Sequence, residues 1–357
     1  MTRSPFLDSG ERRRERVLRR RRRRARRRLL AAVILAIALG VLMTLTHPLA
    51  GGRGGARPAG PSRPPSSRAV SAPSKASPAP PASALAPGPS APPVAGQAPL
   101  SLKLTGIHDA VHVHFKHVPR AGIMVNLDTG RVLWRHREIR PVPIASLTKM
   151  MTALLVVQTA PPDAPVLITR EALAYEGSGV GILPRGRRVQ LETLLNGLLL
   201  PSGNDAAIAL AQHVAGSVGA FIALMNQRAV QMGLRCTRFA SVDGFNDAGR
   251  SCAADLAVLA RADLDQPRVA RIARRRRAVM PLPIRGGKVY LYNNNPLVRL
   301  GYPGISGLKT GYTAAAGGCL VATAERHGVR LAVVLLHSAD PATQARQLLD
   351  RGFRVRH

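Results

Sequence analysis

The chain has 357 residues and a formal net charge of +33, with 52 Lys and Arg against 19 Asp and Glu. The charge is uneven: residues 1–28 hold 14 Arg and three acidic residues, residues 29–100 contribute +5, and the remaining +17 follows residue 100. A basic run is typical of nucleic-acid arms, but the long apolar stretch beside this one favours membrane association and argues against nucleic-acid binding.

Residues 29–46 form that apolar stretch, an uncharged segment of 18 residues. As a helix it would span about 27 Å, close to the roughly 30 Å hydrocarbon core of a bilayer. The arginine-rich tail of residues 1–28 should stay cytoplasmic, which predicts a single-pass membrane protein whose remainder lies outside the cell. The span is longer than a usual signal-peptide core, and Pro48-Leu49-Ala50 matches a cleavage site poorly. An uncleaved signal anchor is predicted, with a cleaved signal as the alternative.

Residues 47–106 are predicted to be a linker. Their central part, residues 51–100, contains 13 Pro, 7 Gly and 8 Ser, with no acidic or aromatic residue. Such a segment cannot bury enough apolar surface to offset the entropy lost on ordering. In an extended polyproline conformation it would reach on the order of 150 Å, far enough to hold a domain away from a membrane.

Residues 107–357 show the pattern of one globular domain. Strands are expected at 121–126 and 132–136, and a second hairpin should join strands 318–324 and 329–337. Because strands lie at both ends and helices between them, an α+β fold is indicated, with one antiparallel sheet completed by both ends of the domain and a helical subdomain inserted. Helices are expected at 150–157, 191–200, 206–214, 220–232, 253–263 (with Ser251 as its cap) and 341–351.

The three cysteines allow two interpretations. In an oxidising compartment they permit one disulfide, and Cys236 and Cys252 are near enough in sequence to pair. Spacing alone does not establish the bond, because all three, with Cys319, could equally be small buried residues.

Ser146-Leu147-Thr148-Lys149 introduces the apolar helix at 150–157. Residues three apart on a helix share a face, so Lys149 can reach the Ser146 hydroxyl and act as its base if the pKa of the amine is lowered. The motif is weak alone, because Ser306 also precedes Lys309 by three residues.

Two further motifs are ordinary alone and informative in combination. Ser202-Gly203-Asn204 could be turn chemistry or a proton relay with an amide ligand, and Lys309-Thr310-Gly311 could be a surface strand end or a carboxylate site. Ser146 precedes Ser202 by 56 residues, and Lys309 follows Ser202 by 107 residues. This order resembles the signature of penicillin-binding proteins and class A β-lactamases.

Longer matches make the resemblance more specific. The chain resembles low-molecular-mass D-alanyl-D-alanine carboxypeptidases, the peptidase S11 family, over about residues 107–353. The resemblance implies a serine β-lactamase/DD-peptidase-like fold, in which β-lactams would acylate the same serine as the peptidoglycan stem peptide. It implies no metal or other cofactor. The matching segments are Ala145–Leu155, Leu198–Ala207, Phe239–Leu259 and Gly307–Thr323.

The resemblance also implies roles for individual residues. Ser146 would attack the carbonyl between the two terminal D-alanines, and Lys149 would take its proton. The N–H groups of Ser146 and Tyr312 would form the oxyanion hole, and Thr310 would hold the terminal carboxylate. The proton relay and the remaining substrate contacts would come from Ser202, Asn204, Lys309 and Gly311.

The chain departs from the family pattern at its C-terminal side. Many members carry an additional β domain with a C-terminal amphipathic anchor helix, and the N-terminal span is expected to replace that anchor. Many also place an arginine before the closing helix to help hold the substrate carboxylate, whereas Pro341 stands there in this chain.

Three other functions compete with carboxypeptidase activity. A class A β-lactamase would need a glutamate 35–40 residues after the second motif, and the interval 237–241 contains none. A transpeptidase or endopeptidase would share the acyl-enzyme and cannot be separated by motifs. A catalytically inactive wall-binding scaffold need not retain all the motif residues. A basic cluster at 274–277 with Arg271 is expected to be a solvated loop, or else a contact with anionic wall polymers.

Overall fold

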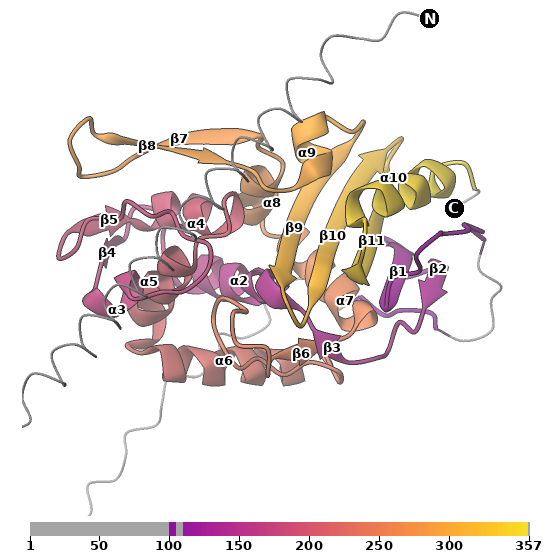
Figure 1. Cartoon of the computed structure of the whole chain (residues 1–357), viewed down its shortest axis with the longest axis horizontal. Coiled ribbons are helices and arrows are strands. Elements are labelled where there is room, and N and C mark those ends of the chain that lie inside the picture. Colours follow the sequence, from indigo (N-terminus) through magenta and orange to yellow (C-terminus); the bar gives the residue numbers. More distant parts are fainter. Residues whose placement is uncertain (1–99, 105–109, 356–357) are drawn as a thin grey trace, which may run out of the picture. The chain divides into compact units, whose positions relative to one another are not determined.

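The centre of the fold is an antiparallel sheet formed from both ends of the predicted globular domain (Figure 1). In the computed structural model, residues 100–104 and 110–355 are described, so the predicted tail, span and most of the linker lie outside the described residues. The five strands run in the order β2-β1-β11-β10-β9. Their bounds are β1 Ala121–Asn126, β2 Val132–His136, β9 Ile305–Thr313, β10 Gly317–Arg326 and β11 Val329–Ser338.

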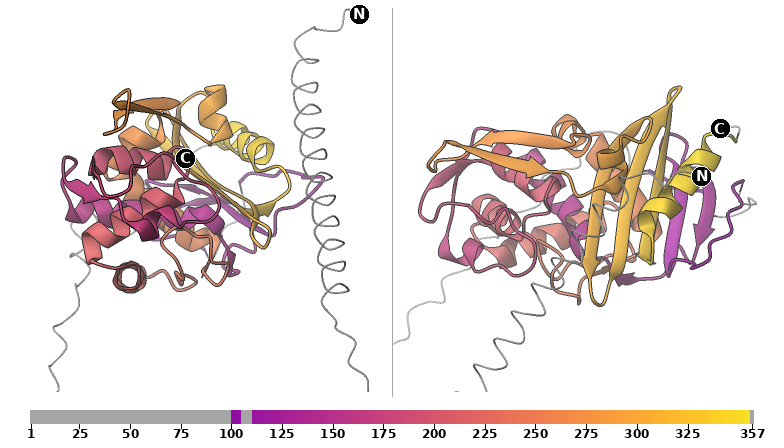
Figure 2. Two further views of the ribbon diagram at one scale, coloured as in Figure 1. Left: turned by 60° about the vertical axis from the view of Figure 1, so that its left-hand side comes forward. Right: turned by 45° about the horizontal axis from the view of Figure 1, so that its top comes forward.

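Each face of the sheet packs against helices, and the alternation of side chains along β1 shows why. Ile123 and Val125 belong to a large core with helix α7 (Ala253–Leu264), whereas Met124 belongs to a second core with helix α10 (Pro341–Gly352). Successive side chains of a strand point to opposite faces, so one strand serves both cores. Figure 2 shows α10 lying across the sheet. Strands β1, β10 and β11 are accordingly buried over most of their length, which explains their nearly continuous apolar sequence.

The helical subdomain is inserted between β2 and β9 and lies beside the sheet (Figure 1). Its central helix, α2 (Lys149–Thr159), is buried from Lys149 to Val156, as expected for an apolar run with no polar face. The helical elements are η1 Ala145–Thr148, α2 Lys149–Thr159, α3 Arg170–Leu173, α4 Leu191–Leu199, α5 Asn204–Ala215, α6 Val218–Gln231, α7 Ala253–Leu264, α8 Pro267–Ala273, α9 Pro296–Leu300 and α10 Pro341–Gly352.

The described residues also form three small two-stranded sheets. Two of them, β3 with β6 and β4 with β5, tie loops of the helical subdomain together. The third, β7 with β8, forms a hairpin that projects from the body beside α4 (Figure 1). The bounds are β3 Val142–Pro143, β4 Pro165–Leu167, β5 Arg188–Gln190, β6 Arg250–Ser251, β7 Arg277–Pro281 and β8 Lys288–Tyr292.

The α+β fold and all the expected helices are confirmed, but some details of the sequence prediction are wrong. Ser251 does not cap α7: Cys252 is the N-cap residue without a side-chain bond, and the Ser251 hydroxyl lies 2.8 Å from that of Thr237. The basic cluster at 274–277 is not one loop, because Arg277 begins strand β7. The domain boundary at 107 stays a prediction, although the N–H of Lys103 already donates to the carbonyl of Gly130.

Among the described residues, no single helix is long and apolar enough to cross a membrane. One bent pair, Asn204–Ala215 with Val218–Gln231 at 83°, meets that test by length and composition alone. The predicted span at 29–46 lies outside the described residues.

A disulfide joins Cys236 to Cys252 across 16 residues, and Cys319 is a buried free thiol. Closing a loop of that length restricts the unfolded chain and stabilises the fold by about 3 kcal/mol. We therefore expect the double substitution Cys236→Ala/Cys252→Ala to lower the free energy of unfolding by about that amount, measured by urea unfolding without reductant. Reductant should produce the same loss in the wild type and in the control Cys319→Ala. Equal stability of the double variant and the wild type would contradict the structural role of this bond.

Candidate active site

Ser146 lies in the tight turn that leads into the buried helix α2. The turn is the short helix η1, and Lys149 is the first residue of α2, so the serine and the lysine face each other across one helical turn. Ala145 adopts a left-handed φ of 48°, which is uncommon for a residue with a Cβ atom and marks a tightly constrained backbone. The sequence prediction of Ser146 at a helix start is therefore confirmed.

The amine of Lys149 is completely buried and makes three hydrogen bonds. Its Nζ lies 3.0 Å from Ser146 Oγ, 2.6 Å from Asn204 Oδ1 and 2.7 Å from the carbonyl oxygen of Asp243. An ammonium group has three protons, so these three acceptors match its full donor capacity. They also fix the position of Nζ beside the serine hydroxyl, because each comes from a different part of the chain.

Burial lowers the pKa of Lys149 to about 7, because removing an ammonium group from water disfavours its charged form. The negative charges of Asp243 and Asp205 act in the opposite direction and raise the pKa. At neutral pH a substantial fraction of the amine is therefore uncharged, and an uncharged amine within hydrogen-bond distance of a hydroxyl can remove its proton.

The loop of the second motif follows helix α4 and leads into α5. Ser202 has a left-handed φ of 68°, and Asn204 is the first residue of α5. The amide of Asn204 bridges two parts of the site: its oxygen accepts from Lys149, and its nitrogen donates to the carbonyl of Glu176. The Ser202 hydroxyl is buried and has no hydrogen-bond partner among the described residues. A hydroxyl in that state is available to a reacting group, since its own donor and acceptor capacity is unused.

The third motif lies on β9, the edge strand of the sheet. Lys309 is 1 % exposed and donates from Nζ to the carbonyl of Thr310 at 2.9 Å. Burial, and next the positive charge of Lys149, hold the pKa of Lys309 well below its usual value. A bound carboxylate would favour the charged form again. Thr310 and Gly311 are half-buried, and the side chain of Tyr312 is 76 % exposed at the end of the motif.

Gly311 explains how the third motif approaches the first. A Cβ atom at this position would lie 3.0 Å from both the backbone nitrogen of Ser146 and the carbonyl oxygen of Ile144. That is tighter than most real Cβ contacts, so glycine lets β9 lie this close to the turn that carries Ser146 without displacing it. The backbone of β9 at Gly311 therefore lies next to the backbone of Ser146. That the N–H groups of Ser146 and Tyr312 form an oxyanion hole stays a prediction.

Several groups that hold the site together were not singled out by sequence reasoning. The buried carboxylate of Asp205 accepts from the N–H groups of Val180 and Gly181, both at 2.9 Å, and so fixes the segment beside Asn204. Thr313, beyond the third motif, donates to Asp247 at 2.6 Å. Asp205 follows the second motif directly, which is a usable signal, whereas a contact such as Thr313 with Asp247 has none in a single sequence.

One group of residues has the geometry of metal ligands but not the chemistry. Within the described ranges, atoms of Cys236, Cys252 and Asp255 lie within 4.8 Å of one another. The two sulfurs are joined in the disulfide, and a carboxylate oxygen of Asp255 accepts from the N–H of Cys236 and the hydroxyl of Thr237, each at 2.7 Å. A metal would need free thiolates here, so this group is a structural contact.

Comparison with known proteins gives a consistent result. The family model described as D-alanyl-D-alanine carboxypeptidase, Peptidase_S11, matches residues 109–340. The D-alanyl-D-alanine carboxypeptidase DacF of Bacillus subtilis is 30 % identical over 245 residues, covering 66 % of this chain and 62 % of that protein. The carboxypeptidase DacB2 of Mycobacterium tuberculosis is 35 % identical over 240 residues, covering 65 % of this chain and 81 % of that protein. The chain thus spans less than two thirds of the length of some relatives.

Solved structures agree. A D-alanyl-D-alanine carboxypeptidase from Mycobacterium tuberculosis H37Rv has a TM-score of 0.64 at 31 % identity, covering 70 % of this chain and 97 % of that chain. A variant of the Streptomyces K15 DD-transpeptidase has a TM-score of 0.62 at 30 % identity, covering 68 % of this chain and all of that one.

Proposed function

The chain belongs to the peptidase S11 family of D-alanyl-D-alanine carboxypeptidases, and on that premise we propose that it removes the terminal D-alanine from peptidoglycan stem pentapeptides. The observation that carries the proposal is the buried Lys149 amine, with a pKa of about 7 and its Nζ 3.0 Å from the Ser146 hydroxyl. A serine with such a partner is an activated nucleophile for acyl transfer.

The reaction proceeds in two steps. Uncharged Lys149 takes the proton of Ser146 as its Oγ attacks the carbonyl of the penultimate D-alanine. The C–N bond then breaks, and the nitrogen of the terminal D-alanine receives a proton and leaves. Water hydrolyses the ester on Ser146 and regenerates the enzyme. The buried Ser202 hydroxyl is well situated to relay protons, because it has no competing partner among the described residues. The N–H groups of Ser146 and Tyr312 stabilise the oxyanion.

The carboxylate of the terminal D-alanine is held by the third motif. Thr310 supplies a hydroxyl, and Lys309 supplies a positive charge whose formation the carboxylate itself favours. Asn204 and Gly311 contribute the remaining contacts, one through its amide and the other by letting the peptide backbone come close. Many family members have an arginine before the closing helix, but helix α10 of this chain begins at Pro341, which has no guanidinium group. Binding of the substrate carboxylate therefore depends more heavily on Lys309 and Thr310 than in those members.

β-Lactams acylate Ser146 in the same way, since they present a strained amide to the nucleophile. We also propose that residues 29–46 anchor the enzyme in the cell membrane, with the N-terminus cytoplasmic and the catalytic domain outside. Residues 47–106 then provide reach into the wall.

A transpeptidase is the second candidate, and the likeness to the Streptomyces K15 DD-transpeptidase favours it. The two reactions share the acyl-enzyme and differ in whether water or an amine accepts the acyl group. The class A β-lactamase alternative lacks its glutamate in the interval 237–241.

The experiment is product analysis with the full-length chain in detergent. Two pentapeptides ending in D-alanyl-D-alanine, with L-lysine or diaminopimelate at position three, are incubated with and without an amine acceptor. We expect tetrapeptide and D-alanine in equal amounts, with little acceptor product. A dominant crosslinked product would replace carboxypeptidase by transpeptidase, and fast nitrocefin turnover without acyl-enzyme would replace both by β-lactamase.

A further inference from the structure

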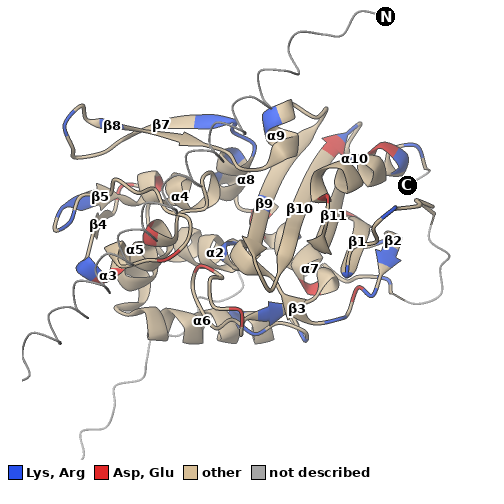
Figure 3. Cartoon of the chain, viewed as in Figure 1, with Lys and Arg blue, Asp and Glu red and all other residues tan. Residues whose placement is uncertain are grey.

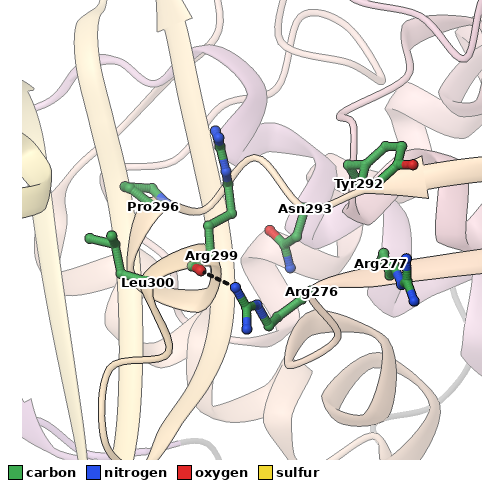
Figure 4. Close-up of a pocket in the computed structure, with 7 residues that line it drawn as sticks. All are labelled: Arg276, Arg277, Tyr292, Asn293, Pro296, Arg299 and Leu300. Carbon is green, nitrogen blue, oxygen red and sulfur yellow. Dashed lines mark hydrogen bonds between the residues drawn. The ribbon is translucent and has the colours of Figure 1, made fainter. Parts of the chain in front are cut away.

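A cavity of about 720 Å³ opens at the base of the β7–β8 hairpin, and none of the catalytic residues lines it. Figure 4 shows its lining residues, among them Arg276 just before β7, Arg277 on β7 and Arg299 on α9. The Arg276 guanidinium donates from Nη2 to the carbonyl oxygen of Arg299 at 2.8 Å, which ties the two basic segments together. Tyr292 and Asn293 complete the polar side of the cavity.

Within residues 100–104 and 110–355, nothing neutralises these three arginines. No carboxylate of the described residues lies within salt-bridge distance of Arg276, Arg277 or Arg299, whereas Arg268 and Arg271 both pair with Glu192. The reason lies in the sequence, because residues 266–324 contain no Asp or Glu at all. Figure 3 shows the result as basic colour on β7 and α9 with no acidic colour on either. An anion would meet a positive field here without competition from the protein.

The hairpin adds exposed aromatic rings beside the arginines. Arg277 pairs with Tyr292 and Val279 pairs with Tyr290, so these four side chains share one face of the hairpin. The two tyrosines are 58 % and 63 % exposed. Exposed rings of this kind have an apolar face and a polar tip, which suits packing against a sugar or polyol unit.

We propose that this surface, defined by Arg276, Arg277, Arg299, Tyr290 and Tyr292, is a second binding site for an anionic wall polymer. Guanidinium groups bind phosphate and carboxylate groups in two-point geometry, and the tyrosines pack against the units between those groups. The cavity is large enough for a segment of such a chain. The choice of a wall polymer over another polyanion rests on the proposed function, whereas the anion site itself does not.

Hydrogen bonds connect the arginine-lined cavity to the loop that carries Ser202. Asn294, next to the cavity residue Asn293, donates from its backbone to the carbonyl of Leu200 and from its side chain to that of Pro201, both at 2.9 Å. These carbonyls lie directly before Ser202. A polymer held in the cavity is therefore bound beside the loop that leads into the active site, and the enzyme is retained on the material that carries its substrate.

The test compares two full-length variants of equal charge. One replaces Arg276, Arg277 and Arg299 by Gln, and the control replaces the exposed Arg185, Arg187 and Arg354 by Gln. Both keep the arginine-rich N-terminal tail. Fluorescence anisotropy is measured with oligomeric glycerol phosphate, oligogalacturonate and a single-stranded oligonucleotide of matched charge. Protection of individual arginines from phenylglyoxal by each polymer gives a local measurement that the tail does not affect.

We expect the cavity variant to bind one or both wall-type oligomers about tenfold more weakly than the wild type, and the control less than about twofold. The oligomer with the larger loss identifies phosphate or carboxylate as the preferred group. Equal losses in the two variants, or no protection of the cavity arginines, would overturn the proposal, as would stronger cavity-dependent binding of the oligonucleotide. D-alanine release from soluble pentapeptide should be unchanged in both variants. Failure of that release in the wild type would instead refute the proposed function.

Discussion

Replacing Ser146 by alanine is expected to reduce D-alanine release and penicillin acylation by at least about 10⁴-fold, because the reaction loses the atom that forms the covalent intermediate. The substitution removes one oxygen that lies 3.0 Å from Lys149 Nζ, and leaves the amine with its bonds to Asn204 and Asp243. The fold should therefore survive. Release is measured with a D-amino-acid oxidase assay, and folding by circular dichroism.

The chain contains its own control for this substitution. Ser306 also stands three residues before a lysine, Lys309, but its hydroxyl lies 2.9 Å from that of Thr323 within the sheet. Ser306→Ala should keep most of the activity. Full activity of Ser146→Ala, or a greater loss in Ser306→Ala, would show that the nucleophile has been misassigned.

Replacing Lys149 by methionine should slow acylation of Ser146 by about 10³-fold, the range expected when a general base is removed. Methionine keeps the apolar length of the side chain, so packing changes little. Lys288→Met, an exposed position on β8, is the matched control and should have no effect on the rate. Stopped-flow acylation by a fluorescent penicillin gives the rate. An unchanged rate in Lys149→Met would remove the lysine from the mechanism.

The pKa of Lys149 predicts how the acylation rate of the wild type depends on pH. With a pKa of about 7, the uncharged fraction of Lys149 rises about tenfold between pH 6 and pH 8, and the acylation rate should rise with it and then level off. Lys149→Met should lose this rise. A rate that falls as pH increases through 7 would mean that the charged amine is the active form.

The sequence was most informative where local pattern and tertiary structure agree. The hairpin of β1 and β2 and the closing helix α10 have clear turn residues or periodicity, and each was predicted nearly to the residue. The second sheet hairpin was predicted with a four-residue loop, but only His327 and Gly328 form the turn, both with positive φ. That two-residue turn extends β10 to Arg326, beyond its predicted end at residue 324, whereas β11 begins at Val329 as predicted.

Other elements had no local signal. Strand β9 contains two glycines and a lysine, a composition that weakens a strand in isolation, and it forms because β10 pairs along its whole length. The β7–β8 hairpin begins in a run of arginines that reads as a solvated loop, and its inner residues Ala278 and Leu291 become buried only against the helical subdomain. The partner of β9 follows it after a three-residue turn, whereas the helical subdomain that buries the β7–β8 hairpin is distant in sequence.

The candidate site likewise contains residues that the sequence reveals and contacts that it does not. Ser146, Lys149, Ser202 and Lys309 could be found from motifs, because side-chain chemistry at fixed spacing leaves a record in the sequence. The carbonyl of Asp243, which fixes Lys149 Nζ at 2.7 Å, leaves none, because every residue has a carbonyl. The lowered pKa of Lys149 also depends on burial, and the groups around its amine include Asn204 and Asp243, which are 55 and 94 positions away and which no local pattern predicts.

The most direct test of the acyl-enzyme account is the location of the penicillin adduct. The full-length chain is incubated briefly with penicillin, digested with trypsin and analysed by mass spectrometry. Cleavage after Arg137 and Lys149, with the Arg140–Pro141 bond resistant, yields the peptide of residues 138–149, in which Ser146 and Thr148 carry the hydroxyls. The account predicts one adduct on this peptide, assigned to Ser146 by fragmentation and absent from Ser146→Ala. An adduct on another peptide, or the same adduct in Ser146→Ala, would contradict it.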